Sequence, residues 1–111
     1  MTAKTLTRLP KDIDGRKFKT DEGVKFEIHG GEYFTDRAIS RQHSKYLGGL
    51  RTGLLVSVSF YGQPVPLVTV DGGVVRLVKI EAGGKPLKGS AAISKKLGLT
   101  ETRQPVGLYA I

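Results

Sequence analysis

The chain of 111 residues has no cysteine, no tryptophan and only one methionine. Without cysteine it can form neither disulfides nor thiolate metal sites, which is compatible with a cytoplasmic or virion setting. Long apolar runs are also missing. The longest uncharged stretch, residues 52–70, contains serines, prolines, Gln63 and Thr69, so it predicts buried strands joined by a turn and no membrane span. The N-terminus lacks the apolar segment of a signal peptide.

Acidic residues are few relative to basic ones. Ten Asp and Glu stand against 18 Lys and Arg, which gives a net charge of +8. The excess divides evenly, with +4 in residues 1–51 and +4 in residues 52–111. Such a chain favours a polyanionic partner, DNA or RNA. The 39% hydrophobic and 25% charged residues predict one globular domain over residues 1–111.

Glycine is abundant, and its pairs mark the places where turns between short elements are expected. Gly-Gly pairs at 30–31, 48–49, 72–73 and 83–84 predict turns. Alternating apolar and polar residues over 24–29 predict a half-buried strand. Further strands are expected over 54–60, 65–70, 74–80 and 106–111, and a weaker pattern predicts that 3–9 and 16–20 pair. Asp71-Gly72-Gly73 predicts a tight hairpin between two of these strands.

Two short helices are expected. Thr35 is the predicted N-cap of the first, which places one apolar face at Ile39, His43, Tyr46, Leu47 and Leu50. The opposite face carries Arg37, Arg41 and Lys45. The second helix is expected to begin at a Ser90 cap, to face inward at Ile93 and Leu97, and to end at Gly98.

Four short motifs occur twice in the same order, at offsets of 50 to 54 residues. The matched pairs are Asp21-Glu22-Gly23-Val24 with Asp71-Gly72-Gly73-Val74, Gly30-Gly31 with Gly83-Gly84, 38–41 with 92–95, and Leu47-Gly48 with Leu97-Gly98. They predict a ββαβ unit duplicated over approximately residues 21–60 and 71–111. Chance similarity of glycine-rich strings is the alternative. The expected fold is mostly β with two short helices, a small barrel in which two interlocked units leave no exposed edges.

The second half of the chain carries a resemblance to a known group of folds. Residues 75–85, 91–99 and 106–111 give a basic strand, a glycine turn, a short helix ending in Leu97-Gly98, and a closing strand. This order resembles the cradle-loop barrel superfamily, which includes the AbrB and MazE swapped-hairpin DNA-binding proteins and the double-psi barrels. The resemblance implies a barrel whose DNA surface surrounds the glycine turn. By position it implicates Lys25, Arg76, Lys79, Lys85 and Lys88.

Two further basic groups carry open alternatives. Arg37, Arg41 and Lys45 either contact phosphates or form a solvated helix face. Lys85, Lys88, Lys95 and Lys96 surround the second helix and either bind an anion or keep the protein soluble. No strand interleaves exposed aromatic residues with basic ones, which favours contact with a duplex over stacking on single strands.

No catalytic set, cofactor motif or metal site is predicted. Asp12-Ile13-Asp14-Gly15 predicts a turn because the rest of a calcium loop is missing. His29 and His43 fall on different elements without ligand spacing. Gly83-Gly84-Lys85 predicts a turn because it lacks the other residues of a phosphate loop.

The leading hypothesis from the sequence is a non-enzymatic, duplex-DNA-binding β-barrel with a regulatory or accessory role. In this hypothesis the basic residues named above contact the DNA, and neither a cofactor nor a membrane is involved. One alternative is a virion structural protein, such as a phage capsid decoration protein, that forms a homo-oligomer or contacts other capsid proteins. Another is a protein-interaction module.

Overall fold

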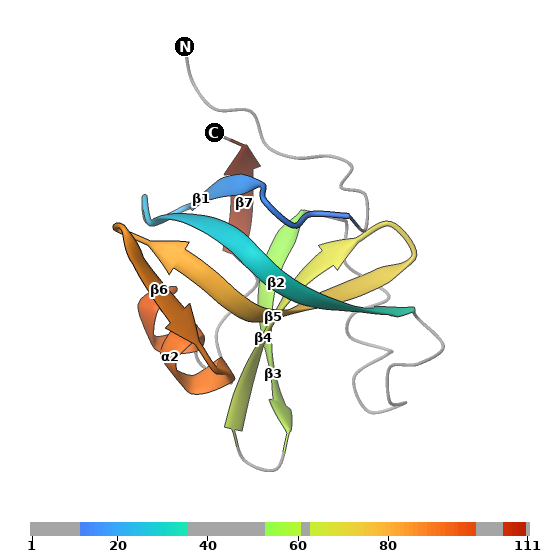
Figure 1. The fold of residues 1–111 in the computed structure, drawn as a ribbon. Coiled ribbons are helices and arrows are strands. Elements are labelled where there is room, and N and C mark those ends of the chain that lie inside the picture. Colours follow the sequence, from blue (N-terminus) through green and yellow to red (C-terminus); the bar gives the residue numbers. More distant parts are fainter. Residues whose placement is uncertain (1–11, 36–52, 61–62, 100–105, 111) are drawn as a thin grey trace.

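The computed structural model describes residues 12–35, 53–60, 63–99 and 106–110 (Figure 1). Within this part the chain forms one helix and seven strands. They are β1 (Lys17–Thr20), β2 (Lys25–Thr35), β3 (Leu54–Phe60), β4 (Gln63–Val70), β5 (Gly73–Ala82), β6 (Lys85–Lys88), α2 (Ser90–Lys96) and β7 (Val106–Ala110). Strands therefore form at the expected places, 24–29, 54–60, 65–70, 74–80 and 106–111, and the weaker pattern over 16–20 forms β1. The strand predicted over 3–9 lies outside the described residues.

The strands close into a small antiparallel β-barrel. The pairing order among the described strands is β2-β1-β7-β3-β4-β5-β6, and β2 also pairs with β5. Six strands (β1, β2, β5, β4, β3 and β7) thus form a ring, and β6 extends from β5 beside the helix (Figure 1). Closure gives each ring strand a neighbour on both sides, so the exposed edges of an open sheet are avoided.

The ladder between β2 and β5 closes the ring, and it contains two opposed bulges. Its register runs from Glu27 opposite Glu81 to Thr35 opposite Gly73. Near the middle, His29 is an extra residue on β2, and directly after it Val78 is an extra residue on β5. Because the insertions fall on different strands, the second restores the register that the first had shifted. Each bulge re-aims its own side chain.

The barrel interior is apolar and includes one face of α2. The largest fully buried side chains of this main core are Phe18, Ile13, Ile28, Leu55, Leu77, Ile80, Ile93, Leu108 and Val68, whereas Val56 belongs to a second cluster with Val58, Val65, Leu67 and Val74. Ile93 and Leu97 of α2 belong to the main core cluster, as their helical spacing predicts. With seven residues α2 is short, and no helix within the described ranges has the length and apolarity to cross a membrane.

The helix ends differ from the prediction at one side only. Gly89 is the N-cap and Ser90 is the first helical residue, with no side-chain capping hydrogen bond. The predicted Ser90 cap is therefore wrong. Gly89 has φ 89°, a positive value that favours glycine, and it turns the chain from β6 into the helix. At the other end Leu97 is the C-cap and Gly98 follows with φ 72°, as predicted.

Of the predicted helices, the described part of the chain contains the second alone. Thr35, expected to cap the first, is the last residue of β2, and residues 36–52 lie outside the described residues. The turn predicted at Asp12-Ile13-Asp14-Gly15 is confirmed, with Gly15 at φ 82°.

The glycine pairs serve different purposes in the fold. Gly83 and Gly84 turn the chain between β5 and β6, as predicted. Gly30 and Gly31 lie inside β2, so the predicted turn there is wrong. Gly31 is needed for close packing instead, because a Cβ on it would lie 2.5 Å from Val75 Cγ1. Gly73, the first residue of β5, has the tightest contact, because a Cβ there would collide with the main chain of Phe34.

We expect Gly73→Ala to lower the free energy of unfolding by about 2–3 kcal/mol, because neither β2 nor β5 can move apart without opening the ladder. Gly30→Ala is the matched control on the same ladder, since its new Cβ would lie 3.7 Å from the nearest atom, Lys79 Cβ. The control should change stability by less than about 0.5 kcal/mol. Urea denaturation measures both variants, and equal losses would contradict this account of Gly73.

Candidate nucleic-acid interface

Positive charge gathers in one part of the described structure. Residues 12–35, which hold β1 and β2, carry four basic and six acidic side chains. Residues 73–99, which hold β5, β6 and α2, carry six basic side chains and the single carboxylate of Glu81. The net charge is divided evenly between the two halves of the sequence, but it is divided unevenly between these groups of strands and helix.

An open pocket lies at the place where β5 changes its neighbour. Up to Arg76 one edge of β5 pairs with β4, and from Lys79 onward the same edge pairs with β6. Leu77 and Val78 fall between the two ladders, and the N–H of Gly89 donates to the carbonyl of Val78 at 3.4 Å. The pocket has a volume of about 580 Å³. Its lining residues are His29, Gly30, Arg76, Leu77, Val78, Lys79, Lys88, Gly89 and Ser90, and we call it the basic pocket.

The basic pocket concentrates positive charge that is only partly neutralised. Arg76, Lys79 and Lys88 line it, and none of the lining residues given above is acidic. Lys79 and Lys88 stand directly opposite each other on β5 and β6, an arrangement of like charges that costs about 0.2–1 kcal/mol. An anion between the two ammonium groups would relieve this repulsion. The lining of the pocket is thus positively charged.

Arg76 is held by a carboxylate from the neighbouring strand. Its Nη2 lies 2.7 Å from Oε1 of Glu32, the residue opposite it on β2. The two side chains are 40% and 50% exposed, so water screens the pair and its contribution to stability is small. An incoming anion can compete with Glu32 for the guanidinium.

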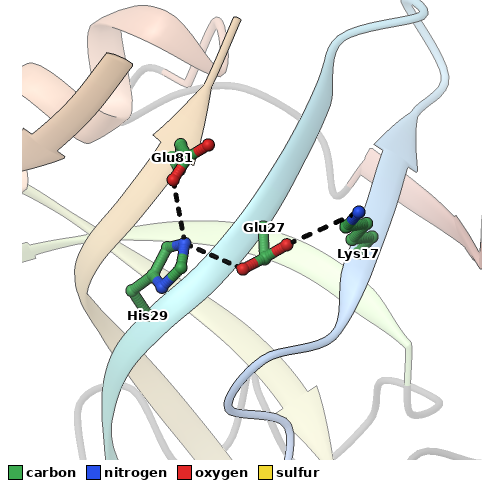
Figure 2. Close-up of polar contacts among 4 residues, drawn as sticks. All are labelled: Lys17, Glu27, His29 and Glu81. Atoms are coloured by element: carbon green, nitrogen blue, oxygen red, sulfur yellow. Dashed lines mark ion pairs between the residues drawn. The ribbon is translucent and has the colours of Figure 1, made fainter. Parts of the chain in front are cut away.

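His29, which lines the pocket, also belongs to a second polar cluster, which Figure 2 draws. His29 Nε2 lies 2.9 Å from Glu27 Oε2 and 3.3 Å from Glu81 Oε2. Glu27 and Glu81 are directly opposed across β2 and β5, and Lys17 Nζ of β1 lies 3.8 Å from Glu27 Oε1. The bulged imidazole thus stands between two carboxylates. Across the described residues, no group of three or more His, Cys, Asp or Glu is arranged to hold a metal ion.

The structure brings together three of the residues that the sequence singled out. Arg76, Lys79 and Lys88 line the basic pocket. Lys85 lies at the turn end of β6 opposite Ala82, and Lys25 begins β2 opposite Lys19, so neither of these lines it. Arg37, Arg41 and Lys45 lie outside the described residues.

Sequence reasoning missed two residues of this site, His29 and Glu32. The signal for His29 was present, because His29-Gly30-Gly31 interrupts the alternation of a strand that otherwise continues to Thr35. A glycine inside a strand marks a bulge or a close backbone approach. Glu32 gave no such signal, since its partner is 44 positions away in the sequence.

Comparisons with protein-family models, with curated proteins and with solved structures found no match to this chain. The function of the site is therefore argued from the positions and charges of its own residues.

We expect Lys88→Glu to raise the free energy of unfolding at low salt by about 0.5 kcal/mol, because it places opposite charges across β5 and β6 at Lys79. Lys85→Glu changes the net charge equally but faces Ala82, so it should have no such effect. Urea denaturation at low and high salt measures both variants. The gain should shrink as salt rises, and a gain of the same size in Lys85→Glu would disprove the pairwise origin.

Proposed function

We propose that this protein is a non-enzymatic DNA-binding barrel that holds the phosphate backbone of a duplex at the basic pocket. The convergence of Arg76, Lys79 and Lys88 on one concave site carries the proposal. Lys and Arg supply most of the protein's contacts to phosphate, and the release of counterions from DNA drives such binding. The opposed lysines add a specific reason, since a phosphate placed between them removes an unfavourable contact.

The lining of the pocket favours a duplex over a single strand. Proteins that bind single strands without sequence preference stack the bases on aromatic side chains. The described residues that line the basic pocket include no Phe, Tyr or Trp, and the one ring among them is the His29 imidazole. Contacts to the sugar–phosphate backbone remain as the main source of affinity. Arg76 is the side chain suited to reach a base edge, because its guanidinium can bind guanine with two hydrogen bonds.

The proposal includes a duplicated ββαβ unit of the cradle-loop type. In its support, the ring order reads the same when β1 is exchanged with β4, β2 with β5, and β3 with β7. An internal two-fold axis makes an element pair antiparallel with its own copy, and the pair on the axis is separated by the repeat offset. The separations in the β2–β5 ladder run from 54 positions at Glu27 and Glu81 to 38 at Thr35 and Gly73. Ile28 pairs with Ile80, 52 positions on, and Leu54 with Gly107, 53 positions on. Both separations fall within the offsets of the sequence motifs.

Fluorescence anisotropy with a random duplex, titrated at about 50 and 200 mM salt, tests the function. We expect binding that weakens steeply with salt. Lys79→Ala and Lys88→Ala should each weaken binding and reduce the slope of log K against log salt by about 1, as the loss of one phosphate contact requires.

Lys25→Ala is the matched control for these variants. It removes the same charge from an exposed position that does not line the pocket. We expect its affinity to stay within about twofold of the parent protein. An equal loss in all three variants would point to a diffuse basic surface, and no binding at low salt would overturn DNA binding in favour of an acidic protein partner.

The ion pair between Arg76 and Glu32 gives a separate test. Glu32→Gln frees the guanidinium for the ligand, so we expect duplex affinity to rise about two- to threefold at low salt, and the gain to fade as salt rises. Asp71→Asn is a control that removes the same charge at the turn between β4 and β5, away from the lining residues. An equal gain from Asp71→Asn would show a net-charge effect only.

A further inference from the structure

We propose that His29 makes ligand binding at the basic pocket depend on protons, so that the pocket binds the phosphate backbone more tightly when His29 is protonated. This inference rests on the proposed function and adds its regulation. It is carried by the position of His29, which lines the pocket and at the same time contacts two opposed carboxylates.

The double bulge explains why one side chain has both neighbours. His29 is the extra residue of β2. It has no directly opposite residue on β5, whereas its neighbours Ile28 and Gly30 pair with Ile80 and Lys79. Its ring reaches Glu27 on its own strand and Glu81 on β5 (Figure 2). Val78, the extra residue on β5, lines the same pocket. A regular ladder would have given His29 a single opposite neighbour.

The charges around His29 come from four strands. Glu27 of β2 and Glu81 of β5 contact the ring, and Lys17 of β1 contacts Glu27 from the far side. Arg76 and Lys79 of β5 and Lys88 of β6 line the pocket with it. His29 therefore stands at the border between a pair of carboxylates and a group of three cations.

Protonation changes the balance at this border. An imidazolium offsets Glu27 and Glu81, which otherwise face each other as like charges. A neutral ring removes that compensation and takes one positive charge from the rim of the pocket. This loss of one positive charge makes the potential at the pocket more negative, which weakens the binding of an anion.

Histidine is the ordinary side chain that changes charge between about pH 5 and 8, while Lys and Arg stay charged. By linkage, a ligand that binds the protonated form better also promotes proton uptake by His29. The side chain of His29 is 34% exposed, so water screens part of the effect.

Anisotropy with a duplex that has 5′-hydroxyl ends, at constant ionic strength, tests the inference because terminal phosphates that also titrate are absent. Between about pH 5.5 and pH 7.5 we expect Kd to rise about three- to tenfold. His29→Gln should bind with little dependence on pH. His43→Gln, which removes the other histidine of the chain, should keep the dependence of the parent protein.

Glu81→Gln tests the electrostatic cause. With one carboxylate fewer beside the ring, the imidazolium is less stabilised, so the pH dependence of Kd should move to lower pH. Proton NMR of the His29 ring gives a readout that a merely structural role would not move. Its titration midpoint should shift to higher pH when the duplex is bound.

The outcomes separate this inference from the function on which it rests. Tight binding that is independent of pH, or a pH dependence that survives in His29→Gln, would overturn the role of His29 and leave DNA binding in place. A dependence lost in His43→Gln would assign it to the other histidine. Absence of binding at every pH would overturn both proposals.

Discussion

Hydrogen bonding between β2 and β5 holds the barrel closed, and the basic pocket depends on the same ladder. The two strands meet closely enough that Gly73 and Gly31 have no room for a side chain. Two bulges on opposite strands interrupt the ladder without changing its register beyond them. A single bulge would have turned the remaining side chains of one strand to the wrong face of the barrel. The paired arrangement keeps the core intact and turns His29 and Val78 toward the pocket.

The electrostatics of this region suit ligand binding better than stability. Lys79 opposes Lys88 on one side of β5, and Glu27 opposes Glu81 on the other. Like charges in directly opposite positions destabilise a sheet. His29 offsets the acidic pair when it is protonated, whereas the opposed lysines have no such neighbour among the lining residues of the pocket. Departures from locally favourable pairing are expected at functional sites. The opposed lysines, with Arg76 on the same pocket, are such a departure.

Much of the fold follows from local patterns, and the failures have local causes. The alternation over residues 24–29 at the start of β2 and the inward face of α2 were predictable because each depends on the spacing of apolar residues. The turn at Asp71-Gly72 was predictable for its residue types. Gly30 and Gly31 were misassigned because glycine serves both turns and close strand contacts, and sequence does not separate the two. Ser90 was misassigned because Gly89, which can adopt a positive φ, occupies the cap in its place. For the site, sequence pointed to Arg76, Lys79 and Lys88 but grouped them with Lys25 and Lys85.

The sequence by itself determined the net positive charge, the strands of the barrel and the apolar face of α2, because these depend on residue type and short-range spacing. Only the tertiary structure decided which charges meet. Arg76 faces Glu32, and His29 reaches Glu81, because a ladder pairs strands that are distant in the sequence. The position of the pocket was decided in the same way, at the point where β5 exchanges β4 for β6. Register between distant strands is set by packing of the whole core, and a shift of one residue would have brought different side chains together.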